Sequence, residues 1–441
     1  MFRWRSRWRP ALAGAAAAAL IAVVTVAGPA SAEPATAVHY PASASATSYA
    51  GLAFDTCAAP SLADMQAWGA SPYRAIGIYV GGQNRTCAQP ELTSSWVAAV
   101  AALGWRLIPI FKGRQPPCGG KPTDLKIVPS AAAAEGSWAA GNASQQVLAL
   151  GMSKGSAIYY DMEAYTTGNT SCRNAVLAFL SAWTKQLHLL GHVSGVYENL
   201  NLGARDLAGV YNSASYARPD ALWIARYDQD PALTGWAGIP DSRWAVHQRA
   251  KQFRADVSET YGGVTLNIDA DNLDAPVATT AFGYAVTAGS NPAIARTGPA
   301  RSYPAVKTYP TGAAVTVVCQ APGSTFGTSP VWDKLTDGSY LPDFRVSTPS
   351  NTSYSAPLTR CRYPFQTTIA AAVNQRAGPG TSYAVTGSLP GGALVWVTCQ
   401  QAGTAVGSTR VWDKISYRHW VSDTYVATPN KTGFSKPVPR C

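Results

Sequence analysis

Residues 156–163 have the sequence SAIYYDME, in which a short apolar run ends in two acidic residues. A short apolar run of this kind is typical of a strand that is buried on both faces of a sheet. Asp161 and Glu163 are two positions apart, so on an extended chain both side chains point the same way, about 7 Å apart. The sequence therefore predicts a strand that presents two carboxyl groups together at its C-terminal end.

Similar apolar runs alternate with helical patterns between residues 48 and 282. The predicted strands are Tyr49–Phe54, Ala75–Val80, Arg106–Phe111, Ser156–Tyr160, Val193–Tyr197, Ala221–Ala225, Trp244–Gln248 and Val264–Asp269. The predicted helices are Leu62–Gly69, Thr93–Leu103, Ala131–Gly151 and Cys172–Leu190, with shorter segments after Gly203. This alternation predicts an α/β fold, a (β/α)8 TIM-type barrel. The alternative is an open doubly wound sheet, although no glycine-rich phosphate loop follows the first strand.

Acidic residues gather at the predicted strand ends, where such barrels hold their reacting groups. They are Asp55, Asp161, Glu163, Glu198, Asp269 and Asp271, from only 24 Asp and Glu in the chain. Asp271 is expected to be a loop or capping acid. Two convergent carboxyl groups are what glycosidic cleavage needs, one as general acid and one to stabilise or attack the sugar carbon.

These segments carry a family resemblance over about residues 48–282. Their order resembles that of the glycoside hydrolase family 25 muramidases: Asp55, Asp161-Met-Glu163, Gly195-Val-Tyr197, Leu222 to Tyr227, Gln248 and Asn267-Ile-Asp269. GLAFDTC (51–57) and YVGG (79–82) look like the opening of a secreted actinobacterial glycoside-hydrolase-like barrel family, domain of unknown function 1906. The resemblance implies a peptidoglycan-like or related glycan as substrate.

The resemblance also implies roles for individual residues. Glu163 would be the general acid, Asp161 would orient or stabilise, and Asp55 would complete the catalytic set. Substrate-binding residues would be Asp269, Tyr197, Glu198, Trp223 and Gln248. Glu198 and Arg249 depart from the muramidase pattern, so a catalytically inactive glycan-binding barrel is a rival interpretation. Trp223 serves equally well as a packing residue.

The C-terminal part repeats itself after a shift of 80 residues. Cys319 then falls on Cys399, and VWDK (331–334) falls on VWDK (411–414). This is a tandem duplication of residues 284–361 and 364–441. Short strands between Gly and Pro turns predict two small all-β units, each a barrel or a sandwich.

The second unit resembles the bacterial SH3-like domains of secreted cell-wall proteins. The segment NQRAGPGTSY (374–383) carries the resemblance. The first unit departs from it at Ile294 and Ala300. The resemblance implies a wall-targeting or peptide-binding role, and a pair of spacers is the alternative.

The chain has eight cysteines and no close CxxC pair of the kind that structural zinc sites use. An even count in an exported chain predicts disulfides. Adjacent loops favour Cys57–Cys87 and Cys118–Cys172 among the three possible barrel pairings. Each C-terminal unit has its own pair, Cys319–Cys361 and Cys399–Cys441.

The first 32 residues have the pattern of a secretory signal peptide. Four arginines precede an apolar run over residues 11–28, and Ala30-Ser-Ala32 follows it. An uncleaved membrane anchor is the alternative. Residues 33–47 predict a flexible lead. Removing the four arginines lowers the net charge from +11 to +7, with scattered basic residues that suit anionic cell-wall polymers better than nucleic acid.

Together these features predict a secreted, cell-wall-associated monomer that hydrolyses a cell-wall glycan or peptidoglycan. An inactive glycan-binding barrel, or an interaction protein with the barrel as scaffold, are the alternatives. We expect no nucleic-acid partner, no stable membrane insertion after signal cleavage, no cofactor and no metal. There is no GxSxG elbow of a serine hydrolase and no EF-hand spacing, although calcium at the acidic residues stays open.

Overall fold

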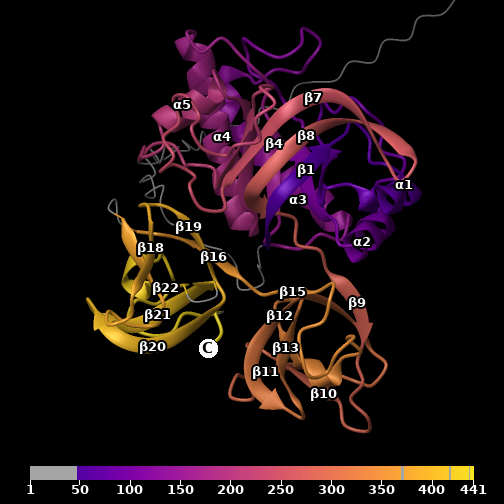
Figure 1. The fold of residues 1–441 in the computed structure, drawn as a ribbon, viewed down its shortest axis with the longest axis vertical. Coiled ribbons are helices and arrows are strands. Elements are labelled where there is room, and N and C mark those ends of the chain that lie inside the picture. The colour runs from indigo at the N-terminus through magenta and orange to yellow at the C-terminus, as the bar shows by residue number, and fades with distance from the viewer. Residues whose placement is uncertain (1–46, 369–371, 417–418, 437) are drawn as a thin grey trace, which may run out of the picture. The chain divides into compact units, whose positions relative to one another are not determined.

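A computed structural model describes residues 47–368, 372–416, 419–436 and 438–441 (Figure 1). The predicted signal peptide and all of the predicted lead before residue 47 lie outside the described residues. Within the described ranges, no helix is both long enough and apolar enough to cross a membrane.

Eight strands close into a barrel in the order of the chain. They are β1 (Thr47–Asp55), β2 (Ala75–Gly81), β3 (Arg106–Phe111), β4 (Ala157–Asp161), β5 (Val193–Asn199), β6 (Ala221–Ala225), β7 (Arg249–Tyr261) and β8 (Val264–Val277). The closed order excludes the open doubly wound sheet. It also brings the ends of β1, β3, β4 and β5, where the sequence places charged residues, to one rim.

Five α-helices are described, all between barrel strands. They are α1 (Leu62–Ala67), α2 (Ser94–Ala102), α3 (Ala132–Ala149), α4 (Thr170–Leu190) and α5 (Gly203–Gly209). Ser61 caps α1 and forms a capping box with Asp64, while the Asn169 side chain accepts a hydrogen bond from the Cys172 amide at the start of α4. No α-helix is described between β6 and β8, so the barrel has fewer helices than the predicted (β/α)8 fold.

The prediction of a (β/α)8 barrel is also wrong for the direction of the last strand. β8 runs antiparallel to both β7 and β1, whereas the other neighbouring pairs are parallel. Only Gly262 and Gly263 separate β7 from β8, and a parallel crossover needs a dozen residues or more. Both glycines have positive φ (57° and 81°), as a tight hairpin turn requires. Figure 1 shows the two strands side by side as a long hairpin.

The predicted strand at Trp244–Gln248 is wrong as well. Trp244 and His247 have φ values of 48° and 52°, in the left-handed region, and the segment forms turns. The true seventh strand follows it, from Arg249 to Tyr261. Its polar alternation belongs to a ribbon whose outer half extends past the barrel.

Alternation along β4 divides the hydrophobic core into two layers. Tyr159 points into the barrel and lies edge-to-face against Trp223, with ring centroids 5.7 Å apart. Tyr160 points outward and packs on Phe179 and Trp183 of α4, at 4.9 and 5.0 Å. The strand is therefore held on both faces, and Asp161 follows directly from this fixed segment.

Residues 284–361 and 364–441, here called repeat 1 and repeat 2, are both all-β. The first set of strands is β9 (Phe282–Ala285), β10 (Ala293–Arg296), β11 (Ala305–Tyr309), β12 (Ala314–Phe326), β13 (Ser329–Leu335), β14 (Tyr340–Pro342) and β15 (Thr359–Arg360). The second set is β16 (Tyr363–Gln366), β17 (Val373–Arg376), β18 (Val385–Leu389), β19 (Leu394–Val397), β20 (Cys399–Val406), β21 (Thr409–Ser416) and β22 (His419–Ser422). Corresponding strands pair alike, so the duplication extends to topology.

Each repeat contains its own copy of the same buried polar network. In repeat 1 the Gln320 amide donates to both Asp333 and Asp343, at 2.9 Å each. Burial and the neighbouring Asp343 raise the pKa of Asp333 to about 8. The same positions in repeat 2 are Gln400, Asp413 and Asp423, with distances of 2.7 and 3.1 Å.

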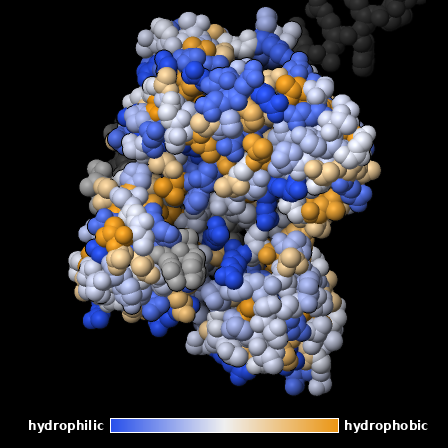
Figure 2. Space-filling view, viewed as in Figure 1, coloured by the Kyte–Doolittle hydropathy of each residue, from blue (hydrophilic) through white to orange (hydrophobic). Residues whose placement is uncertain are grey.

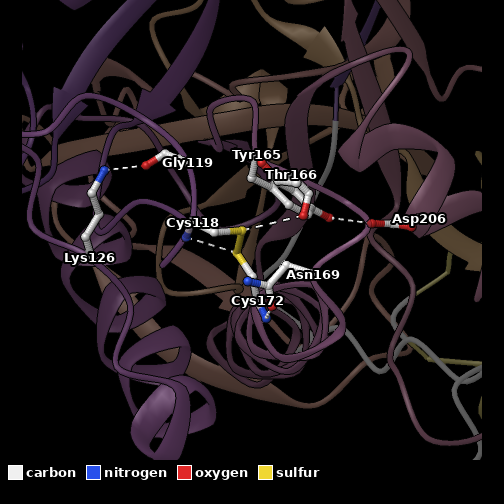
Figure 3. Close-up of a disulfide and its surroundings, with 8 residues drawn as sticks. All are labelled: Cys118, Gly119, Lys126, Tyr165, Thr166, Asn169, Cys172 and Asp206. Atoms are coloured by element: carbon white, nitrogen blue, oxygen red, sulfur yellow. Dashed lines mark hydrogen bonds between the residues drawn. A yellow bond between two sulfur atoms is a disulfide. The ribbon is translucent and has the colours of Figure 1, made fainter.

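The four disulfides have the predicted pairing, which confirms those predictions. They are Cys57–Cys87, Cys118–Cys172, Cys319–Cys361 and Cys399–Cys441. The second of them ties the loop after β3 to the first turn of α4 (Figure 3). Both barrel disulfides join loops that follow strands β1 to β4, on the rim where Asp55, Asp161 and Glu163 lie.

Candidate functional site

Lys112 is the charged centre of the site. It follows β3 directly, and its Nζ atom lies 2.8 Å from Asp161 Oδ2 and also contacts Glu163 Oε1. One ammonium group thus bridges the two acids of the DME segment. The two carboxyl groups lie on one side of the chain, as the spacing of two residues predicts.

The two bridged acids differ in exposure. The side chain of Glu163 is 39% exposed and that of Asp161 only 4%. Burial raises the pKa of Asp161 to about 6, against the attraction of Lys112, which lowers it. Glu163 is therefore the group that can reach a ligand, with Asp161 behind it.

Gln115 holds the backbone of the two acids in place. Its side-chain amide donates to the Asp161 carbonyl at 2.8 Å, and its side-chain oxygen accepts from the Glu163 amide at 2.8 Å. Gln115 is completely buried. A single side chain of the β3 loop therefore bonds to two backbone groups at the end of β4.

Gln252 of β7 joins a second pair of acids. Its Nε2 atom donates to Asp55 Oδ2 at 2.7 Å and to Asp269 Oδ2 at 3.2 Å. Its Oε1 atom accepts from the hydroxyl groups of Tyr197 and Tyr227, at 2.7 and 3.1 Å. Gln252 therefore links β1, β5 and β8 across the rim, with Tyr227 exposed at its edge.

Asp55 is held largely in its protonated form. Burial and the adjacent Asp269 carboxylate raise the pKa of Asp55 to about 8.

Asp271, predicted as a loop or capping acid, is instead completely buried within β8 and accepts a hydrogen bond from Trp223 Nε1 at 3.0 Å. Burial and Asp55 raise the pKa of Asp271 well above its usual value. We call the acids at this end of the barrel the acidic cluster: Asp55, Asp161, Glu163, Asp269 and Asp271.

Gln248 is not part of this cluster. It is completely buried ahead of β7, and its amide donates to the Asp220 carbonyl at 2.6 Å. It lies level with the first residue of β6, whereas Gln252 pairs with Ala225, the last. The glutamine that contacts the acids is thus four residues further along, because the seventh strand begins later than the sequence predicts.

Glu198 faces away from the cluster. Strand alternation turns Tyr197 to the rim and Glu198 to the helical layer, where it is completely buried against Gly203 of α5. Burial and the nearby Asp206 raise its pKa well above its usual value. The structure therefore places Glu198 where it cannot bind substrate directly.

Trp223 is a packing residue. Its ring is 1% exposed and lies edge-to-face on Tyr197, with centroids 5.4 Å apart. A ring without free area offers no surface on which a sugar can stack. The exposed aromatic side chain at the rim is Tyr227, 59% accessible, four residues later in the same segment.

Sequence reasoning missed Lys112, Gln115, Gln252 and Tyr227 as site residues. Lys112 did give a signal, because it is a charged residue directly after an apolar strand, as Asp55 and Asp161 are. Gln115 and Gln252 act through amide hydrogen bonds, which no spacing rule detects. Among the residues with described side chains, no group of three His, Cys, Asp or Glu is arranged to hold a metal ion.

The fold and this site define the class of the barrel. Residues 66–273 match the family model "Rv2525c-like, glycoside hydrolase-like domain". The barrel is thus a glycoside hydrolase-like domain, with its acidic cluster on the rim formed by the ends of the parallel strands.

Two Bacillus subtilis (strain 168) proteins, both described as uncharacterized, match shorter stretches of the chain. YraJ is 37% identical over 78 residues, 15% of this chain and 66% of YraJ, so the chain covers just under two thirds of it. YraI is 33% identical over 92 residues, 18% of this chain and 74% of YraI. The chain belongs to the family of YraI through that stretch.

Several solved structures match the chain at low sequence identity. The Tat-secreted protein Rv2525c of Mycobacterium tuberculosis is 16% identical, with a TM-score of 0.37 over 51% of this chain and 96% of that one. The catalytic domain of endolysin ply40 from Listeria monocytogenes bacteriophage P40 is 13% identical, with a TM-score of 0.32 over 52% and 94%. The spore cortex lytic enzyme SleM of Clostridium perfringens is 11% identical, with a TM-score of 0.34 over 65% and 92%.

Proposed function

We propose that the barrel binds and hydrolyses a glycan of the bacterial cell wall. The observation that carries this proposal is the pair Asp161 and Glu163, brought together at the end of β4 in a domain that matches a glycoside hydrolase-like family. The resemblance to muramidases favours a peptidoglycan-like substrate. Two carboxyl groups on one rim provide the acid and the stabilising charge that glycosidic cleavage requires.

In this proposal Glu163 is the general acid. Its side chain is the more exposed of the two, so it can reach the oxygen of a glycosidic bond. Asp161 is buried and bound to Lys112, which suits a group that stays in place and stabilises positive charge at the sugar carbon. It can equally orient a neighbouring acetamido group.

Lys112 adds a condition to this mechanism. Glu163 Oε1 contacts the ammonium group in the free protein, and an oxygen occupied in this way cannot deliver a proton to a ligand. The proton is therefore delivered from Oε2, or substrate separates Glu163 from Lys112 before the proton moves. The ammonium group then remains with Asp161, whose charge the transition state needs.

Other residues near Asp161 and Glu163 complete the catalytic set or bind substrate. Asp55 completes the catalytic set as a protonated carboxyl group, since burial raises its pKa to about 8. Asp269 and Tyr197, both hydrogen-bonded to Gln252, are held in position to bind substrate. The exposed ring of Tyr227 provides a face on which a sugar can stack.

Export and wall binding complete the proposal. Four disulfides favour an oxidising compartment, which agrees with the predicted signal peptide over residues 1–32. We assign repeats 1 and 2 the role of SH3-like modules that retain the protein at the wall.

Release of new reducing ends from purified peptidoglycan tests the enzymatic part. Glu163→Gln should abolish release while wall sedimentation and the unfolding midpoint stay unchanged. Glu91→Gln is the matched control, because Glu91 is an exposed glutamate outside the acidic cluster. Release that persists in Glu163→Gln would remove Glu163 as the acid.

The contact of Lys112 with both acids favours a second candidate, a barrel that binds glycan without cutting it. An ammonium group that neutralises both carboxylates lowers their attraction for a developing cation. In that case the wild type would release no reducing ends, and Glu163→Gln would weaken glycan binding.

A further inference from the structure

Outside the first 32 residues, which carry four arginines, the net positive charge of the chain lies in the repeats. Residues 48–282 contain 17 Lys and Arg against 18 Asp and Glu. Repeat 1 contains 6 against 3, and repeat 2 contains 7 against 2. The barrel is thus nearly neutral, and the repeats provide the electrostatic attraction to an anionic surface.

Repeat 1 has a pocket of about 270 Å³ that concentrates this charge. Three arginines line it, together with an aromatic ring and small apolar residues: Arg296, Arg301, Arg345, Phe326, Pro292 and Ile294. No acidic residue is among the lining residues described. The volume is slightly below that of drug-sized ligand sites, so it suits one chemical group better than a whole oligosaccharide.

Phe326 forms the apolar centre of this pocket. The guanidinium of Arg301 lies 4.5 Å from the ring centroid, and that of Arg345 lies 5.4 Å from it. Two cations thus share one ring instead of pairing with carboxylates. Contact with the ring occupies the guanidinium faces and leaves N–H groups at their edges available.

The arginines keep donors for a ligand. Arg296 Nη1 donates to the Tyr303 carbonyl at 2.8 Å, and Arg345 Nη1 donates to the Ala288 carbonyl. Each guanidinium has five N–H donors, so these bonds leave most of them unused. In the part of the chain that the structure describes, no ion pair is formed by any of the three.

Repeat 2 lacks this arrangement although its fold is the same. The shift of 80 residues places Thr381 at the position of Arg301, Val406 at Phe326 and Tyr425 at Arg345. Only Arg376, at the position of Arg296, is retained. The pocket chemistry is therefore particular to repeat 1 and is not a requirement of the fold.

We propose that this pocket of repeat 1 binds an oxyanion, a carboxylate or a phosphate group, carried by a cell-wall polymer. Guanidinium groups bind both anions through paired N–H···O bonds, and the apolar floor strengthens these bonds by excluding water. The inference rests on the wall-binding role proposed for the repeats. It adds the chemical class of the ligand and the pocket that would bind it. It does not depend on catalysis by the barrel.

Calorimetric titration of the full chain with two probes tests the proposal. N-acetylmuramyl-L-alanyl-D-isoglutamine carries the carboxylate, and soluble poly(glycerol phosphate) carries the phosphate. The test variant is Arg301→Thr/Phe326→Val/Arg345→Tyr, which gives repeat 1 the residues that repeat 2 has at the same positions. The single variant Arg301→Thr, at an exposed position, covers the case in which the triple variant does not fold.

At least one probe should bind the wild type, about tenfold or more weakly in the triple variant, and more weakly at high salt. Arg376→Gln in repeat 2 is the matched control and should leave binding unchanged. The probe that binds identifies the source of the oxyanion. Failure of both probes, or unchanged affinity in both variants, overturns the proposal. If the pocket proposal is overturned and the triple variant still sediments with the wall like the wild type, the wall-binding role of the repeats is retained. Only the assignment of the pocket as the binding site is then rejected.

Discussion

The carboxyl group of Glu198 lies directly against Gly203, where a Cβ atom would come within 2.0 Å of Glu198 Oε2. Glu198 is completely buried, and no hydrogen-bond partner of its two oxygens is found among the described residues. Burial raises its pKa well above the usual value, with Asp206 and Asp161 adding to the effect. The close fit of glycine and carboxyl group leads to two predictions.

Glu198→Gln should stabilise the protein at alkaline pH. The raised pKa means that the folded state binds a proton that the unfolded state releases, so stability is lost as pH rises above the usual pKa of glutamate. Glutamine has nearly the same shape and no charge. We expect a gain in unfolding free energy of about 1–3 kcal/mol at pH 8 and little change at pH 4, measured by urea denaturation. A gain of equal size at both pH values would contradict this explanation.

Gly203→Ala should destabilise the protein by about 1–3 kcal/mol, because the new methyl group overlaps the Glu198 carboxyl group. Gly141→Ala is the matched control. Gly141 lies inside α3, and an added Cβ would have no atom within 4 Å. Alanine there should stabilise by about 0.5–1 kcal/mol. Thermal unfolding of both variants measures the contrast, and a neutral Gly203→Ala would show that α5 shifts freely.

Lys112→Met should raise the pKa of Asp161 further above about 6, because the attraction that opposes burial is lost. Asp161 must be ionised to stabilise positive charge, so the acidic limb of the pH–activity profile should move to higher pH. A 13C titration of the aspartate carboxyl groups measures the same shift without activity. Lys121→Met, at an exposed position, is the control. An unchanged Asp161 titration would mean that Lys112 does not act on it.

Gln115→Ala should cost about 2–4 kcal/mol of unfolding free energy. The change removes a hydrogen bond to the Asp161 carbonyl and one from the Glu163 amide, and both backbone groups would lose their buried partner. Because the two acids lose their support, activity should fall by a larger factor than stability accounts for. Gln83→Ala, on an exposed loop, should be neutral in both assays. Equal behaviour of the two variants would refute the positioning role.

The double variant Cys118→Ser/Cys172→Ser should lower the unfolding free energy by about 4 kcal/mol in the chain-entropy model, because the disulfide closes a loop with a sequence separation of 54. Denaturation of the oxidised variant and wild type gives the difference. Reduction of the wild type alone does not, since it opens all four disulfides. Full stability in the variant would show that α4 and the β3 loop are held by other contacts.

Most of the barrel could be predicted from sequence because β1 to β6 are short, apolar and sharply bounded. β7 could not, because its polar alternation reflects a ribbon that leaves the barrel, while the apolar segment before it is bent by left-handed residues at Trp244 and His247. The site residues likewise differ in how far the sequence predicts them. Spacing along one strand brought Asp161 and Glu163 together, whereas Gln252 depends on the register between β6 and β7.

The direction of β8 decides where the barrel can be extended. β8 enters beside Asp55 and ends at Val277, which pairs with Thr47 at the start of β1. The chain thus leaves the barrel on the rim opposite the acidic cluster. Any segment that follows β8 therefore begins on the rim opposite Asp55, Asp161 and Glu163, and can be exchanged or lengthened without starting beside these acids.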